Sequence, residues 1–268
     1  MIALPNRLLF LEMDMGTEDA KRLIQKWNSY RIFLNSPKAY YENKHITMFF
    51  ILDGIAKVQL RQKTTMRSLM EYLGCRNNGN FEAYFETPGK CHEIIRTKYL
   101  SAASELSADE YAVLTDLRRF RFRISSPSFL KEIGFHNTYY IKRLGEDGKL
   151  NFVGNRPQEF IVDLWMDRRF SVFQRIVSHK QIEARIRKLA NREVSYLLIV
   201  PSVAWAKKIP LVTKSSIPEG LYFSTPERLR NKFNWYEALF QIDQLKNLYH
   251  FQDDSLRVPV HEKRLIKL

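Results

Sequence analysis

Three short apolar runs of this chain occur twice in the same order, and this repetition predicts the fold class more directly than any other pattern. The matching pairs are residues 9–14 (LFLEMD) with 160–165 (FIVDLW), residues 47–52 (TMFFIL) with 196–200 (YLLIV), and residues 83–90 (AYFETPGK) with 221–228 (LYFSTPER). Runs of this length are typical of buried strands, and helical patterns lie between them. Strands that alternate with helices predict α/β layers, so we expect two similar α/β segments. Chance similarity between two sets of apolar strands is the alternative.

The middle of the chain has a different pattern from the repeated segments. Short helices are predicted over residues 107–120, 126–133 and 137–144, and a strand pair over residues 149–153 and 158–165 follows them. This order is typical of a winged helix-turn-helix, which places its recognition helix in the DNA major groove. A small helical linker is the alternative. The predicted fold class is therefore α/β (α+β), with two α/β segments flanking a winged-helix-like region. The predicted segment bounds are residues 1–100, 101–165 and 166–268.

The charge of the chain favours a polyanionic partner. Lys and Arg number 43 against 29 Asp and Glu, which gives a net charge of +14. Residues 1–100 carry +5, residues 101–165 carry 0 and residues 166–268 carry +9. Together with the aromatic residues, this surplus favours nucleic acid, and we expect double-stranded DNA held through its phosphates. A solvated helix face is the alternative for such clusters. The candidate DNA contacts are Arg118, Arg119, Arg121, Arg123, Lys142, Arg143, Arg185, Arg187, Lys188 and Arg192.

Other classes of protein are disfavoured by composition. The longest apolar run, residues 46–55, is interrupted by Asp53 and is shorter than the roughly 20 residues of a membrane span, so no membrane partner is expected. The N-terminal residues lack a signal-peptide pattern, and we expect a cytoplasmic protein. Cys75 and Cys91 are the two cysteines, and the six histidines are scattered, which gives neither a disulfide framework nor a zinc site.

Glu12 and Asp14 are the candidate catalytic and metal-binding residues. They alternate along one predicted strand, so their side chains lie on the same side of it. Two carboxylates at a strand end supply oxygen ligands for Mg²⁺, which is the cofactor expected if the protein is catalytic; otherwise none is expected. Lys26, in the next predicted helix, is placed to stabilise charge or to orient water in metal-dependent phosphodiester hydrolysis. The alternative is structural, with surface ion pairs and a carboxylate that caps the helix.

The second repeat keeps only part of this pattern. Glu12 corresponds to Asp163, whereas Asp14 corresponds to Trp165. Paired carboxylates therefore occur only in the first copy, and residues 166–268 are predicted to be a degenerate α/β segment.

The run FLEMDMGTEDAKRLIQKWNSY, the apolar strand that follows it and the motif YFETP resemble the replication-relaxation family of plasmid and conjugative-element proteins. The resemblance covers about residues 8–90. It implies a winged helix combined with a PD-(D/E)XK-like domain, so both α/β segments are expected to be restriction-endonuclease-like. The residues at the family's motif positions are Glu12, Asp14, Gly16, Thr17, Lys26 and Tyr30.

The resemblance also bears on the N-terminus. Nucleases of this fold carry an acidic residue on a strand before the one that ends in Glu-x-Asp, and residues 1–11 contain none. The family's winged helix normally precedes its nuclease-like half, and none precedes it here. We therefore expect the first segment to be N-terminally incomplete, with a homodimer or a partner subunit completing its sheet.

Three functions are weighed from these observations. The first is a non-catalytic DNA-binding accessory protein that acts in replication, relaxation or mobilisation of a plasmid or another mobile element. The second is a Mg²⁺-dependent PD-(D/E)XK-like endonuclease that nicks DNA with Glu12, Asp14 and Lys26. The third is a structural or protein–protein module whose aromatic residues form a core. Whether the chain is an enzyme is left open by the sequence.

Overall fold

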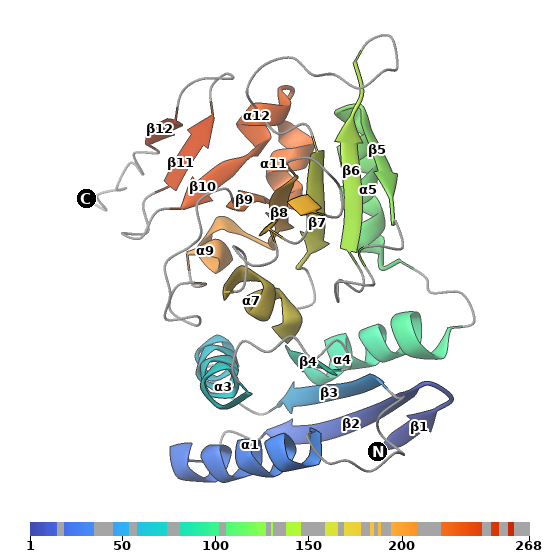
Figure 1. Cartoon of the computed structure of the whole chain (residues 1–268), viewed down its shortest axis with the longest axis vertical. Helices are drawn as coiled ribbons and strands as arrows, with labels where there is room; N and C mark the ends of the chain where they lie inside the picture. Colours follow the sequence, from blue (N-terminus) through green and yellow to red (C-terminus); the bar gives the residue numbers. More distant parts are fainter. Residues whose placement is uncertain are drawn as a thin grey trace.

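The chain folds into two mixed β-sheets with helices packed on both (Figure 1). The description rests on a computed structural model. It describes residues 1–14, 19–34, 45–53, 58–73, 81–101, 106–126, 130, 138–145, 159–165, 169–177, 183–184, 187–188, 194–207, 209, 221–242, 248–251 and 257–259. The mixed α/β class expected from the sequence is confirmed. No helix among these residues is long and apolar enough to cross a membrane.

The first sheet has the strand order β1-β2-β3-β4, and we call it sheet 1. Its first two strands are antiparallel, whereas β2, β3 and β4 are parallel. Its strands are β1 (Ile2–Leu4), β2 (Arg7–Asp14), β3 (His45–Leu52) and β4 (Phe81–Glu86). The helices after them are α1 (Ala20–Leu34), α3 (Val58–Leu73), α4 (Pro88–Ile94) and the π-helix η1 (Ile95–Leu100).

Alternation along the strands of sheet 1 sends aromatic rings to both of its faces. Phe50 stacks on Phe85 at 4.8 Å between ring centroids and meets Trp27 of α1 edge-on at 5.0 Å. On the other face, Phe49 stacks on Tyr84 at 5.0 Å, in a cluster that α4 completes. Both faces are therefore apolar, as expected for a parallel sheet that is covered by helices.

The second sheet, called sheet 2, has the strand order β12-β11-β10-β9-β8-β7-β6-β5. Strands β7, β8 and β9 are parallel, and their outer neighbours are antiparallel. Its strands are β5 (Phe122–Ser125), β6 (Thr138–Arg143), β7 (Glu159–Leu164), β8 (Ser195–Ile199), β9 (Leu221–Ser224), β10 (Phe240–Ile242), β11 (Leu248–Phe251) and β12 (Arg257–Pro259). Two separate apolar clusters cover its two faces. One includes α5 (Ala108–Arg119), α11 (Pro226–Asn231) and α12 (Trp235–Ala238), and the other includes α7 (Phe170–Val177) and α9 (Val203–Ala206).

The matched runs of the sequence repeat form three neighbouring parallel strands in each sheet. In each, an antiparallel pair leads into three parallel strands, as β1-β2-β3-β4 in sheet 1 and as β6-β7-β8-β9 in sheet 2. The last parallel strand of each set is followed by a Thr-Pro pair that opens a helix, with Thr87 and Thr225 as N-caps. Proline is favoured at the first helical position because its fixed φ suits the helix. The two sheets therefore resemble each other in the order of these strands and in the start of the helix that follows them.

The prediction of a third helix over residues 137–144, as part of a winged helix-turn-helix, is wrong. Residues 138–143 form strand β6, which pairs with β5 and β7. The first predicted helix is present as α5, and most of residues 126–133 and all of residues 149–153 lie outside the described residues. Strands on both sides of residue 165 belong to sheet 2, so the segment boundary predicted there falls inside one sheet.

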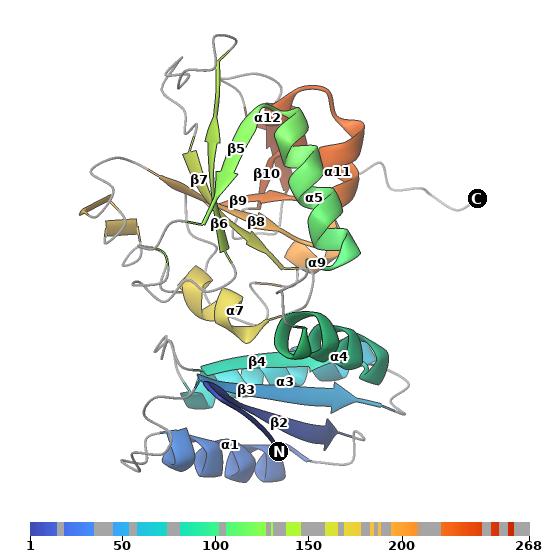
Figure 2. The same ribbon diagram turned by 90° about the vertical axis from the view of Figure 1, so that its right-hand side faces the viewer.

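Helix α7 lies between the two sheets, as the turned view shows (Figure 2). The carboxylate of Glu82, on β4, accepts a hydrogen bond from Ser171 N at 3.0 Å and another from Ser171 Oγ at 2.5 Å. This carboxylate therefore caps the N-terminus of α7, where backbone N–H groups lack helical partners. Tyr84 and Arg169 also form an isolated antiparallel bridge. These contacts join residues that are about ninety positions apart in the chain.

Candidate nucleic-acid interface

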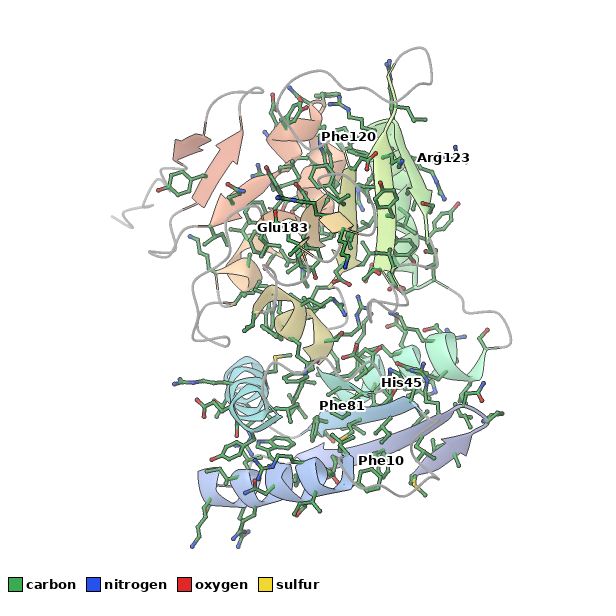
Figure 3. All side chains as sticks on the ribbon, viewed as in Figure 1. Phe10, His45, Phe81, Phe120, Arg123 and Glu183 are labelled. Carbon is green, nitrogen blue, oxygen red and sulfur yellow. The ribbon has the colours of Figure 1, made fainter. Side chains whose placement is uncertain are left out.

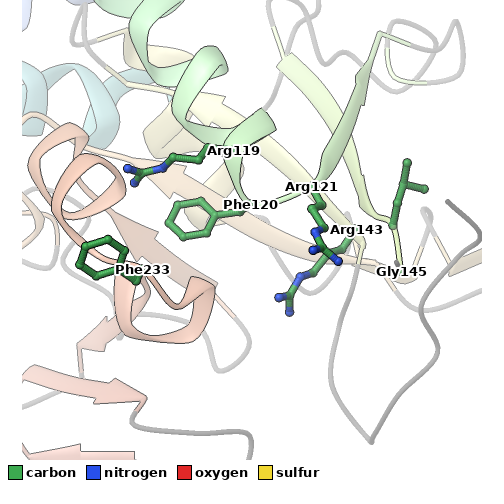
Figure 4. Close-up of a pocket in the computed structure, with 7 residues that line it drawn as sticks. Arg119, Phe120, Arg121, Arg143, Gly145 and Phe233 are labelled. Atoms are coloured by element: carbon green, nitrogen blue, oxygen red, sulfur yellow. The ribbon is translucent and has the colours of Figure 1, made fainter. Parts of the chain in front are cut away.

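A basic pocket of about 410 Å³ opens at one end of sheet 2 (Figure 4). It lies where the end of α5, the last residues of β6 and the connection between α11 and α12 meet. Three arginines and two phenylalanines contribute to its wall. The lining residues are Arg119, Phe120, Arg121, Arg143, Leu144, Gly145 and Phe233.

The backbone at Arg121 has an unusual conformation. Helix α5 ends at Arg119 and β5 begins at Phe122, so the chain reverses within two residues. Arg121 has a φ of 67°, the left-handed conformation, which costs a residue with a side chain about 1–2 kcal/mol. Its N–H donates to Arg118 O at 2.8 Å, and its carbonyl accepts from Leu144 N at 3.0 Å. These bonds hold an arginine at the pocket wall in a conformation that glycine would adopt more easily.

Arg119 connects α5 to the chain that carries Phe233. Its Nη2 atom donates to Leu229 O and, at 3.2 Å, to Lys232 O. The guanidinium also lies 5.2 Å from the ring centroid of Phe120. Phe233 follows directly and is 98% exposed. Arg119 thus positions the connection, while the ring of Phe233 remains in solvent.

Two further predicted contact residues lie beside the pocket on β6. Arg143 places its guanidinium 5.5 Å from the ring centroid of Tyr236, in a cation–π contact. Lys142 pairs with Glu159 of β7 at 3.3 Å and lies opposite Arg123 of β5. Lys142 therefore has its charge compensated, whereas Arg143 is held by an aromatic ring that carries no charge.

The structure brings three of the ten predicted DNA contacts, Arg119, Arg121 and Arg143, to one pocket, whereas Arg123 and Lys142 lie on the face of the sheet opposite to that of Arg143. Arg118, Arg119, Arg121, Arg123, Lys142 and Arg143 all lie on the end of α5 and on the β5–β6 pair. Figure 3 labels Phe120 and Arg123 in this half, and Phe10 and Phe81 in sheet 1.

The other four predicted contacts belong to residues 185–192. Arg187 pairs with Glu183 at 3.6 Å, and Lys188 is exposed. Arg185 and Arg192 lie outside the described residues. Phe233 was not identified from the sequence as a candidate binding residue. The signal that could have indicated it is its position between the polar residues Lys232 and Asn234.

A second cluster surrounds Glu12 in sheet 1. Lys26 Nζ lies 3.1 Å from Glu12 Oε2, and the hydroxyl of Tyr30 donates to Glu12 Oε1. Lys26 and Tyr30 are four residues apart on α1 and share one helix face. The side chains of Lys26 and Glu12 are 21% and 31% exposed. Asp14 ends β2 opposite Leu52, and its side chain lies outside the described part of the chain.

The groups around Glu12 do not fit a divalent cation in this arrangement. Mg²⁺ requires several oxygen ligands, but here an ammonium group and a phenol occupy the two oxygens of Glu12. Among the residues that the structure describes, no group of three or more His, Cys, Asp and Glu could hold a metal ion. The catalytic roles of Glu12, Asp14 and Lys26 and the Mg²⁺ site stay predictions.

Asp163, the repeat counterpart of Glu12, lies in a similar cluster that is buried rather than partly exposed. Asp163 of β7 accepts two bonds from Arg175 of α7, at 2.7 and 2.8 Å, and one from the hydroxyl of Tyr196. Arg169 lies 3.5 Å away, and all four side chains are almost fully buried. Burial by itself would lower the pKa of Arg175, but the charges of Asp163, Tyr196 and Glu82 together raise the pKa overall. Burial and Asp163 both raise the pKa of Tyr196 well above its usual value.

Sequence reasoning found Asp163 but missed its partners. In both copies a basic residue of the next helix pairs with the strand carboxylate, since Lys26 follows Glu12 by 14 positions and Arg175 follows Asp163 by 12. The spacing could have indicated Arg175. Comparison of the chain with known protein families, with curated proteins and with solved structures finds no match.

Proposed function

We propose that this protein is a DNA-binding accessory protein, without chemistry of its own, that acts in the replication, relaxation or mobilisation of a plasmid or another mobile element. The observation that carries the proposal is the pocket lined by Arg119, Arg121 and Arg143 at the end of α5 and on β6, with the exposed Arg118 next to it in the chain. The kind of process rests on the resemblance to the replication-relaxation family. The cytoplasm is the compartment that this role implies.

The chemistry of these cations suits a phosphate backbone. Guanidinium groups present several N–H donors in a plane and bind phosphate oxygens in pairs. Contacts to phosphates position a protein on DNA without reading its sequence. Arg121 and Arg143 line a pocket wall, while Arg118 and Arg123 are exposed on either side of Arg121 along the chain. The set therefore supports binding of the backbone of double-stranded DNA.

Salt dependence tests this proposal. We expect the dissociation constant for a short labelled duplex, measured by fluorescence anisotropy, to rise steeply between about 50 and 200 mM salt. Replacing Arg121 and Arg143 together by Gln should reduce the slope of log affinity against log salt by about two, because each lost phosphate contact removes about 0.9. The matched control is Arg96→Gln, since Arg96 is an exposed arginine of η1 in the sheet 1 half. Duplex binding that is insensitive to salt, or equal losses in both variants, would contradict the proposal.

A Mg²⁺-dependent endonuclease is the second candidate function. It rests on the resemblance and on the contact between two of its predicted residues, Glu12 and Lys26, although a metal ion would have to displace Lys26 or Tyr30 from the oxygens of Glu12. Nicking of supercoiled plasmid with Mg²⁺ or Mn²⁺ tests it, with Glu12→Ala as the variant. Glu93→Ala, at the partly exposed Lys90–Glu93 ion pair, is the matched control. Nicking that survives Glu12→Ala would remove Glu12 from any mechanism, and absence of nicking with either metal favours the accessory role.

A further inference from the structure

Phe233 is an aromatic residue with almost all of its surface in solvent. It is 98% exposed, whereas Phe120, which lines the same pocket, is 6% exposed. Single exposed apolar residues are common on protein surfaces. Phe233 differs from these because it lies at a pocket that arginines also line (Figure 4).

The chain on both sides of Phe233 is held by hydrogen bonds to its backbone. On the N-terminal side, Arg119 donates to Leu229 O and Lys232 O. On the C-terminal side, Asn234 caps α12 by accepting from Tyr236 N at 3.0 Å. A binding group that is held in place before binding loses less entropy when its ligand arrives. The ring of Phe233 is therefore presented on a backbone that is already ordered.

Two of the three arginines lie across the pocket from this ring, whereas Arg119 lies on the side of Phe233. Figure 4 shows Phe233 on one side, Arg121 and Arg143 on the other, and Phe120 between them. The volume of about 410 Å³ lies in the range of small-ligand pockets, which is about 300–1,000 Å³. The pocket thus offers a flat apolar surface at one side and positive charge at the other.

We propose that this pocket holds one unpaired nucleotide, with its base stacked on Phe233 and its phosphate bound by Arg121 and Arg143. Aromatic side chains bind bases of single strands by stacking, whereas a base inside a duplex already stacks on its neighbours. A nucleotide carries a flat base and a phosphate in one molecule, so it matches a pocket that has an aromatic ring and arginines. This inference rests on the proposed DNA-binding function and adds to it a preference for single-stranded or unwound DNA.

The test compares one sequence as a single strand and as a duplex. Phe233→Ala should weaken single-strand binding about tenfold, the loss of one base stack, and leave duplex binding within about twofold. Phe233→Trp should retain single-strand affinity because indole also stacks. The matched control is Tyr111→Ala, since Tyr111 of α5 is an aromatic residue that is 62% exposed and does not line the pocket. Competition with deoxyadenosine monophosphate distinguishes the source of the nucleotide. Displacement at micromolar concentrations supports a free nucleotide, and its absence supports a nucleotide within a strand.

Separate outcomes would overturn the inference and the function. Suppose that duplex binding is salt-sensitive, but that Phe233→Ala leaves the affinity for both forms of DNA unchanged or lowers both affinities equally. The proposed nucleotide pocket is then contradicted, and the accessory role stands. If Tyr111→Ala lowers single-strand affinity as much as Phe233→Ala does, the effect is not specific to the pocket and the inference also fails. If the wild-type protein binds neither form of DNA, the proposed function fails as well.

Discussion

Asp163 is a buried carboxylate whose charge is compensated by buried arginines. Arg175 approaches it to 2.7 Å and Arg169 to 3.5 Å, and these side chains are at most 1% exposed. Neutralising the carboxylate would leave guanidinium charge uncompensated in a medium of low polarity. We predict that Asp163→Asn lowers the free energy of unfolding by about 3–5 kcal/mol, measured by urea unfolding.

Glu12→Gln is the control for this prediction. Glu12 is the repeat counterpart of Asp163 and makes the same kind of ion pair, but its side chain is 31% exposed. Water already screens such a pair, so the expected loss is about 1 kcal/mol or less. Comparable losses in the two variants would show that burial does not distinguish the two copies.

Cys91 is a second buried residue, and the raised pKa of its thiol can be measured. Burial, and then the nearby charge of Glu86, raises the pKa of the Cys91 thiol to about 12. The folded state keeps this proton where the unfolded state has lost it, so stability is present below the unfolded pKa and falls as the pH rises through the range from about 9 to 12. Burial also raises the pKa of Tyr99 and of Tyr196, which contribute in the same direction.

Thiol titration checks this expectation. In a Cys75→Ser background, Cys91 should react with iodoacetamide at about pH 8 far more slowly in the folded protein than in urea, because the thiolate is the nucleophile. Urea unfolding at rising alkaline pH should show a shallower decline in a Cys91→Ala variant. Rapid reaction in the folded state would contradict the assigned burial.

Arg121 combines backbone strain with a proposed role in binding. Its φ of 67° costs about 1 kcal/mol that glycine would avoid, although glycine also gains freedom in the unfolded chain. We predict that Arg121→Gly leaves the thermal midpoint unchanged or higher while it weakens DNA binding. Arg121→Val should lower both, since a β-branched residue tolerates this conformation poorly. A destabilised glycine variant would show that the side chain of Arg121 supports the fold.

Among the elements, α5 has a complete capping box. Ser107 Oγ accepts from Glu110 N at 3.2 Å, and Glu110 Oε2 accepts from Ser107 N at 3.0 Å. We predict that Ser107→Ala lowers the free energy of unfolding by about 1 kcal/mol, measured by thermal unfolding. Thr115→Ala, at an exposed position in the same helix, should change it by about 0.5 kcal/mol or less and serves as the control.

Strand β6 shows which elements local sequence could not predict. Residues 137–144 include apolar residues at helical spacing, but Thr138, Tyr139 and Tyr140 belong to types that favour strands. Pairing on both sides, with β5 and with β7, decides the outcome. The parallel strands were predictable because their apolar runs are continuous and helical patterns separate them, whereas a strand of mixed polarity such as β6 depends on neighbours that are distant in sequence.

The candidate site was predictable to a similar degree. The arginines from Arg118 to Arg123 were recognisable as a cluster in the sequence. The pocket was not, because it also requires Arg143 and Phe233, which tertiary structure brings to the same place. Lys26 and Tyr30 were correctly placed on one helix face by their spacing, but their contact with Glu12 depends on how α1 packs on β2.

For the whole molecule, the contact between Glu82 and α7 links the two sheets. Glu82 is 8% exposed and satisfies two donors of Ser171 across the interface. We predict that the wild-type protein unfolds in a single transition by circular dichroism and by tryptophan fluorescence. Glu82→Ala should lower the free energy of unfolding by about 1–3 kcal/mol, because buried donors lose their acceptor.

Coincidence of the two probes tests this coupling. Trp27 is in α1, which packs on sheet 1, whereas Trp165 directly follows β7 and Trp235 is in α12, which packs on sheet 2, so fluorescence reports both halves. A wild-type protein with two separate transitions would contradict the coupling. The expected homodimer or partner subunit at the N-terminal sheet stays a prediction, for which β1 is the edge strand.

The arginines that hold the loop around Phe233 affect which sequence changes this loop can tolerate during evolution. Arg119 binds the carbonyls of Leu229 and Lys232, and Arg228 binds those of Ala238 and Leu239. A carbonyl oxygen is the same whatever side chain its residue carries. Mutations at the exposed positions of this loop can therefore accumulate without releasing it, so the ligand preference of the pocket rim can evolve while the loop keeps its shape.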